Sequence, residues 1–101
     1  MSLNSSFSMS STVVATKDNL SSDLEEETVI LDTKSGVYYG LNTVGTSIWN
    51  LVHQPKTIKE IQDALLAKYE VEPEQCNQEL LVILQQLESE GLIEVNHETS
   101  A

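Results

Sequence analysis

The sequence predicts an α+β fold in a winged-helix-like arrangement, with a three-stranded antiparallel β-meander followed by three α-helices. Two patterns predict this fold. Up to about residue 41, short runs of β-branched and aromatic residues alternate with turn-forming residues, as in strands joined by tight connections. From residue 42 onward, apolar residues recur three and four positions apart, which is the spacing of one helix face. Sheet and helices are therefore expected to follow one another along the chain.

The strands are predicted from the positions of the turns between them. We expect strands at Leu20–Leu24, Thr28–Asp32 and Val37–Leu41, with the acidic run Glu25–Glu27 forming the first turn. Gly36 suits a left-handed position in the second turn, since glycine adopts a positive φ at no steric cost. Alternation along the last strand places Val37, Tyr39 and Leu41 on one face and Tyr38 and Gly40 on the other.

Capping signals predict the ends of the helices. Asn42 is suited to cap the first helix directly after the last strand. Thr57 and Glu60 have the spacing of a capping box, in which each side chain accepts a free backbone N–H at the start of the second helix. Pro73 falls in the first turn of the third helix, where its missing N–H costs nothing. Gly91 is placed to end that helix in a left-handed conformation.

The length and the ends of the chain predict a single domain. The 101 residues fit one hydrophobic core, which we expect over residues 19–95. Residues 1–18 are expected to form a disordered, serine-rich tail, although the pair Val13-Val14 is also compatible with a short β segment. Residues 96–101 are expected to form a flexible C-terminal tail. The sequence has no secretory signal and no apolar run of about 20 residues, so we expect the protein in the cytoplasm.

The charge balance argues against nucleic-acid and membrane partners. Sixteen acidic residues face five lysines and no arginine, and the formal net charge is −11. A nucleic-acid binder needs basic side chains to neutralise phosphates, and an anionic membrane would repel this chain. The charge instead favours solubility and attraction to a basic partner.

No group of residues has the pattern of a catalytic or metal site. Cys76 is the only cysteine, and its place on an apolar stripe favours a core role over that of a nucleophile. His53 and His97 have no second histidine or cysteine at ligand spacing. The glycines match neither a phosphate loop nor a dinucleotide-binding motif. We therefore expect a binding protein that is not an enzyme and needs no metal or cofactor.

The strand Val37–Leu41 is the feature most suited to binding. It carries no charged residue and no proline. Charged residues and prolines usually protect the edge of a sheet from pairing with another chain. If it lies at an edge, an extended peptide can add to it as a further strand. Alternatively, the N-terminal segment or a second copy of the chain covers this edge, and the residues alone favour neither interpretation. A winged-helix adaptor or transcription regulator is another alternative, which the lack of basic side chains on the last helix disfavours.

The last strand and the first helix are similar in sequence to one protein family. The resemblance is to proteins related to pyrroloquinoline-quinone biosynthesis protein D (PqqD). These proteins carry a similar motif, and the matching positions here are Gly36, Tyr38, Tyr39, Leu41, Asn42, Gly45, Ile48 and Trp49. The resemblance covers about residues 20 to 95 and continues through Thr57-Ile58-x-Glu60-Ile61, Tyr69 and Leu84-x-x-Leu87-x-x-x-Gly91-Leu92. Within the family, the strand resembles the free-standing recognition proteins of lasso-peptide clusters more than the quinone-pathway member.

The resemblance implies a recognition element for ribosomally synthesised, modified peptides. Such proteins bind the leader segment of a precursor peptide and present it to a modifying enzyme such as a leader protease, a cyclase or a radical enzyme. The leader adds as an antiparallel strand to the third strand, in a groove whose other wall is the third helix. The resemblance also leaves open a monomer or a weak homodimer.

Carried over to this sequence, the resemblance gives the residues of both walls. They are Val37, Tyr38, Tyr39, Gly40 and Leu41 on the strand, and Cys76, Leu80, Ile83, Leu84 and Leu87 on the helix. Some of these helix residues must pack the core instead, because one stripe cannot serve both purposes. Glu79 is placed to meet a basic side chain of the leader.

Overall fold

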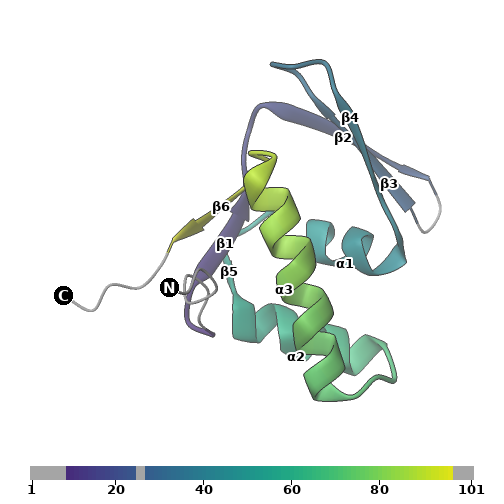
Figure 1. The fold of residues 1–101 in the computed structure, drawn as a ribbon, viewed down its shortest axis with the longest axis vertical. Helices are drawn as coiled ribbons and strands as arrows, with labels where there is room; N and C mark the ends of the chain where they lie inside the picture. Colours follow the sequence, from purple (N-terminus) through teal and green to yellow (C-terminus); the bar gives the residue numbers. More distant parts are fainter. Residues whose placement is uncertain (1–8, 25–26, 97–101) are drawn as a thin grey trace.

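The computed structural model describes residues 9–24 and 27–96. Over these residues the chain forms three helices and two three-stranded antiparallel sheets (Figure 1). In chain order the elements are β1 (Thr12–Ala15), β2 (Asn19–Leu24), β3 (Glu27–Asp32), β4 (Tyr38–Leu41), α1 (Thr43–Leu51), β5 (Lys56–Thr57), α2 (Ile58–Lys68), α3 (Pro73–Ser89) and β6 (Ile93–Asn96). The predicted α+β class is confirmed, as are the meander and the three helices that follow it.

The sheet β2-β3-β4 is the predicted meander. Strand β4 begins one residue later than expected because Val37 closes the preceding turn, where its carbonyl accepts the Asp32 N–H at 2.9 Å. Gly36 has a φ of +75°, so it occupies the left-handed position that the sequence indicated. Tyr38 is exposed and Tyr39 is half-buried, as alternation along the strand predicts.

The second sheet, with the strand order β5-β1-β6, was not predicted. Its central strand β1 lies within the segment that we assigned to a disordered tail, and Val13 is fully buried there. The tail assignment was therefore wrong for residues 12–15, whereas the short β segment at Val13-Val14 is confirmed. Thr12 lies opposite both Thr57 and Asn96, and these distant partners supply the ladder that stabilises a four-residue strand. The tail assignments were also wrong for Asn96, which is the last residue of β6, and for Ser11 and Thr16, since Ser11 is buried and Thr16 bonds to the Gly91 carbonyl. Residues 1–8 and 97–101 of the expected tails lie outside the described residues.

The helix ends follow the predicted capping signals. The Asn42 side chain accepts the Gly45 N–H at 2.9 Å, and Thr57 and Glu60 form the complete capping box. Helix α3 begins at Pro73 and is followed by Gly91, whose φ is +75°. After α3, the N–H groups of residues 91 and 92 bond to the carbonyls of residues 88 and 87, which is the pattern of a Schellman motif.

The hydrophobic core lies between the helices and the inner faces of both sheets. Its buried side chains come from every helix and from both sheets: Val13, Ile30, Ile48, Trp49, Val52, Ile58, Ile61, Leu65, Cys76, Leu80, Leu84, Leu87, Leu92 and Ile93. Helix α3 contributes four of these residues, at the i, i+4, i+8 and i+11 positions from Cys76. None of the helices in the described ranges has the length and the apolar character that crossing a membrane requires.

Candidate functional site

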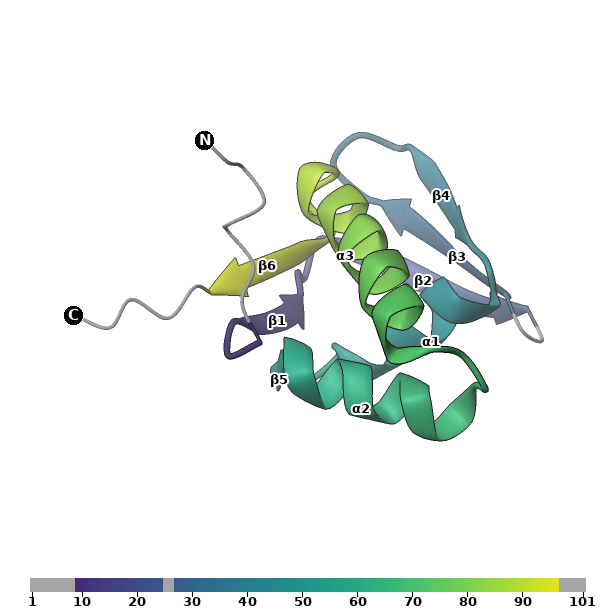
Figure 2. The ribbon, with the colours of Figure 1, turned by 60° about the horizontal axis from the view of Figure 1, so that its bottom comes forward.

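A groove of about 410 Å³ lies between strand β4 and the C-terminal half of helix α3. Figure 2 shows the ribbons of β4 and α3, and α1 follows directly from β4. The lining residues are Tyr38, Tyr39, Gly40, Leu41, Asn42, Gly45, Ile83, Gln86, Leu87, Glu90 and Leu92. A groove between the third strand of the meander and the third helix is therefore present where the sequence led us to expect one.

Strand β4 leaves one backbone edge unpaired. Within the described part of the chain it pairs only with β3, and the N-terminal strand β1 belongs to the other sheet. The bond from the Asp32 N–H to the Val37 carbonyl marks a hydrogen-bonded pair, after which the pairs alternate along the antiparallel ladder. Tyr38 and Gly40 consequently occupy non-hydrogen-bonded positions, and their N–H and C=O groups point to the free edge.

The helical wall of the groove is a different stripe of α3 from the one that packs the core. Ile83, Gln86, Leu87 and Glu90 are spaced three, one and three residues apart, so they follow one another along one side of the helix. Leu87 lies where this stripe meets the core stripe and is nearly fully buried, whereas Ile83 is half-buried. The wall is therefore apolar along its inner part and polar along its outer part.

A hydrogen bond connects the two walls near the end of α3. The Tyr39 hydroxyl donates to Glu90 Oε1 at 2.9 Å, which joins β4 to the residue that caps the helix. The hydrogen bond to the Glu90 carboxylate raises the pKa of Tyr39, because it is lost when the phenol ionises and the like charges then repel. Tyr39 therefore remains a neutral donor at physiological pH.

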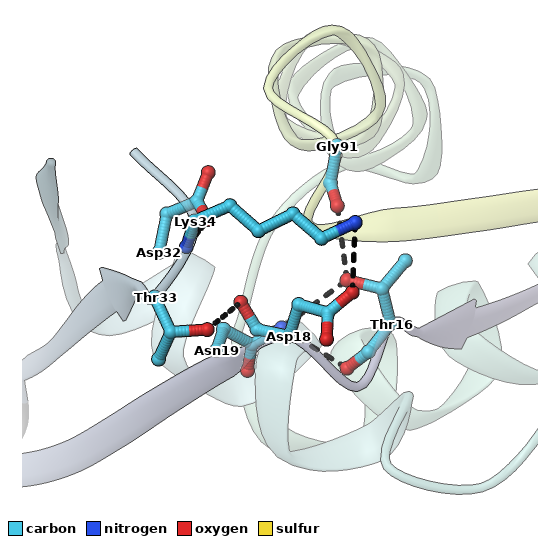
Figure 3. Close-up of polar contacts among 7 residues, drawn as sticks. All are labelled: Thr16, Asp18, Asn19, Asp32, Thr33, Lys34 and Gly91. Atoms are coloured by element: carbon cyan, nitrogen blue, oxygen red, sulfur yellow. Dashed lines mark hydrogen bonds and ion pairs between the residues drawn. The ribbon is translucent and has the colours of Figure 1, made fainter. Parts of the chain in front are cut away.

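A polar cluster at the link between β1 and β2 holds the same end of the groove (Figure 3). The Thr16 hydroxyl donates to the Gly91 carbonyl at 2.9 Å, just after α3. The Thr33 hydroxyl, on the turn before β4, donates to the Asp18 carbonyl at 3.1 Å, and Lys34 forms an ion pair with the Asp18 side chain at 3.1 Å. This link therefore contacts both the end of the helical wall and the turn that leads into the strand wall.

Gly45 allows the strand wall to pass into α1 without a loop. A methyl group at this position would lie 3.3 Å from both Leu41 Cβ and Asn42 Oδ1, closer than side chains normally approach. Asn42 must keep its place because its side chain caps α1. The close packing of Gly45 against Leu41 and Asn42 fixes the angle between β4 and α1, and thus the position of the strand wall.

Six of the residues predicted for the walls line the groove: Tyr38, Tyr39, Gly40, Leu41, Ile83 and Leu87. The other five do not. Cys76, Leu80 and Leu84 were misplaced, because their side chains are buried in the core and cannot reach the groove surface. Val37 lies in the turn and is 45% exposed, and Glu79 is an exposed residue of α3 outside the lining.

Sequence reasoning missed five lining residues, namely Asn42, Gly45, Gln86, Glu90 and Leu92. Asn42 and Gly45 had been interpreted only as a cap and a family motif. Gln86 and Glu90 could have been found by following the helix register from Ile83 toward its C-terminus. Both residues are polar and lie outside the apolar stripe on which the prediction rested.

The groove is lined by apolar and neutral polar side chains and by one glutamate. Over residues 9–24 and 27–96, no group of three or more His, Cys, Asp or Glu residues is placed to hold a metal ion. Desolvation raises the pKa of the Cys76 thiol, with a smaller contribution from Glu79, so this cysteine stays protonated and weakly nucleophilic. Elsewhere on α3, the exposed positions 74, 75 and 78 are Glu, Gln and Gln, which offer phosphate no cationic contact.

Comparison with known proteins gives a consistent result. Residues 27–93 match the family model for coenzyme PQQ synthesis protein D (PqqD). The structure is similar to that of TbiB1 in complex with the TbiA(β) leader peptide, with a TM-score of 0.75 and 32% sequence identity over 80% of this chain and 94% of that one. It is also similar to lasso peptide synthetase B1 complexed with the leader peptide, with a TM-score of 0.71 and 20% identity over 81% and 96% of the two chains. No curated protein matches the sequence significantly.

Proposed function

The chain belongs to the PqqD family, and from this premise we propose that it binds the leader segment of a ribosomally synthesised precursor peptide by strand addition. The observation that carries the proposal is the groove itself, because one of its walls has a free backbone edge and the other has an apolar helix face. Backbone bonds to a sheet edge supply affinity for an extended peptide, and contacts with alternate side chains supply selectivity.

The free backbone groups define how the peptide would bind. The outward N–H and C=O groups of Tyr38 and Gly40 offer two donors and two acceptors to an added strand. Alternate side chains of that strand would then enter the groove toward Ile83 and Leu87. The remaining side chains would lie on the other face of the sheet, beside the exposed ring of Tyr38.

Both structural relatives are leader-peptide complexes, and they support this proposal to different degrees. TbiB1 is similar in sequence as well as in fold, so its leader-peptide ligand supports a ligand of the same kind here. The lasso peptide synthetase B1 shares only 20% of its residues with this chain and supports the fold alone. The TbiB1 complex and the family match, together with the resemblance of the β4 motif to the recognition proteins of lasso-peptide clusters, favour a role in lasso-peptide or related natural-product biosynthesis.

We further propose that the protein acts without catalysis, by tethering. A bound leader holds its core peptide near a modifying enzyme docked on the same complex, which raises the local concentration of the substrate to about the millimolar range. No bond is made or broken by this chain itself. Because precursor peptides are made by ribosomes, we place this step in the cytoplasm.

Amide chemical shifts during titration with the TbiA(β) leader peptide test the proposal. We expect the largest changes at Tyr38, Gly40 and the lining residues of α3, with little change at Ser22 on the far strand β2. A scrambled peptide of the same composition is the control for non-specific binding to an acidic protein. Shifts that cluster away from the groove, or no saturation at about 1 mM peptide, would contradict the proposal.

A further inference from the structure

We infer that Glu90 selects a lysine or arginine side chain in the bound peptide, at the end of the groove where α3 stops. The inference rests on the proposed function and adds to it the chemistry of one peptide position. Glu90 is the only residue with a formal charge in the described lining of the groove, whose other members are apolar or neutral polar. A charged group surrounded by neutral ones determines which sign of ligand charge is favoured at that position.

The position of Glu90 on its helix supports a cation from outside the chain. It caps the C-terminus of α3, where the helix dipole places negative charge and a basic side chain is normally favourable. The last turn of α3 contains no basic residue and holds a second acid, Glu88. Two negatively charged side chains, Glu88 and Glu90, therefore lie at the negative end of the helix dipole. A cationic ligand would reduce the electrostatic repulsion between them.

The Glu90 carboxylate is oriented but keeps binding capacity. Its Oε1 accepts the Tyr39 hydroxyl at 2.9 Å, which holds the side chain across the groove. Among the described residues, the second carboxylate oxygen has no hydrogen-bond or ion-pair partner. A carboxylate has about four lone-pair sites, so an ammonium or guanidinium can bind while the bond to Tyr39 remains. Lys34, on the turn before β4, is already paired with Asp18.

The test must separate a local contact from the general attraction of an acidic protein for basic peptides. Glu79 offers a matched control, since it is also an exposed glutamate of α3 but lies outside the groove lining. Glu79→Gln and Glu90→Gln remove the same charge and change the net charge equally. The full chain in each form is used to select binders from a displayed library of random 15-residue peptides.

We expect one basic position among the aligned peptides selected by the wild type and by Glu79→Gln, and its loss with Glu90→Gln. Changing that lysine or arginine to methionine in a selected peptide should raise Kd about threefold to tenfold for the first two proteins. For Glu90→Gln, the same peptide change should alter Kd by less than about twofold.

Two outcomes separate this inference from the proposed function. Selected peptides without a basic position, or a basic position that persists with Glu90→Gln, overturn the role of Glu90 and leave leader binding intact. If none of the three proteins enriches any peptide, the proposed function fails, and the inference fails with it.

Discussion

A proline at Gly40 should block peptide addition while leaving the sheet paired. Gly40 lies in the middle of the predicted interaction edge, and its N–H points away from β3. No atom lies within 4 Å of a Cβ built at this position, so the pyrrolidine ring meets open space on the Cβ side. Gly40→Pro therefore removes a donor that the fold does not use and places a ring at the edge where the peptide would bind.

The expected loss of affinity follows from the single backbone hydrogen bond that the Gly40→Pro protein cannot donate to the peptide. A peptide carbonyl that is buried in the complex without its donor costs about 1–3 kcal/mol, which corresponds to a Kd about 5-fold to 150-fold higher. The free energy of unfolding should change by only about 1 kcal/mol, because proline is tolerated on an edge strand when its N–H site faces outward.

Isothermal titration calorimetry with the TbiA(β) leader peptide measures the loss, and circular dichroism checks the fold. Gly40→Ala is the matched control, since it keeps the N–H and should bind about as well as the wild type. Tyr39→Pro provides a contrast, because the Tyr39 N–H faces β3 and its loss should destabilise the meander. A folded Gly40→Pro protein that binds within about twofold of Gly40→Ala would refute strand addition at β4.

Three further predictions concern the helical wall, the polar cluster and the turn before β4. Ile83→Asp should weaken peptide binding at least tenfold by calorimetry, since burying its side chain is worth about 1.5–3 kcal/mol, and unchanged binding would remove α3 from the site. Thr16→Val should lower the free energy of unfolding by about 0.5–1.5 kcal/mol in urea titrations, because the bond to the Gly91 carbonyl is lost; an equal midpoint would show that this bond contributes nothing. The Lys34 N–H lowers the pKa of Asp32, so its carboxylate stabilises the fold at neutral pH and this contribution disappears as the pH falls below about 4. Thermal unfolding should therefore show Asp32→Asn less stable than the wild type at pH 7, with a difference that narrows as the pH falls below about 4, and a difference that widens on acidification would contradict this assignment.

The sequence was most informative where structure depends on neighbours a few residues away. Each helix start was identified correctly, because Asn42, Thr57 and Pro73 act on backbone groups within one turn. The meander followed in the same way from its turns, including the positive φ of Gly36. The groove between the last strand of the meander and the last helix was expected from the family resemblance and not from these local signals.

The second sheet could not be predicted because its pairing is long-range. Strand β1 is paired with β6 near the other end of the chain, and β5 has only two residues. Propensity over four residues cannot distinguish a strand from an extended tail when its partner lies about 80 residues away. Val13 gave a local signal, but only its burial shows that it belongs to the core.

The helical wall was predicted only in part, because the prediction took the residues of the core surface and of the groove surface from the same apolar stripe of α3. The stripe through Leu80 and Leu84 packs the core, and the groove uses a neighbouring stripe that is half polar. Leu80→Asp would therefore bury a charge and unfold the protein, so it cannot report on peptide binding. Ile83, which is half-buried, is the suitable position for that test.

Contacts within the protein fix the two walls of the groove at both ends in the absence of a ligand. This affects the entropic cost of binding. At one end β4 passes directly into α1 through Asn42 and Gly45. At the other end the Tyr39–Glu90 bond and the contacts of Thr16 and Asp18 connect the turn before β4 to the end of α3. With the two walls fixed in this way, the ordering cost of complex formation falls mainly on the peptide. A leader that binds here need only become extended, and this favours a flexible segment over a folded partner.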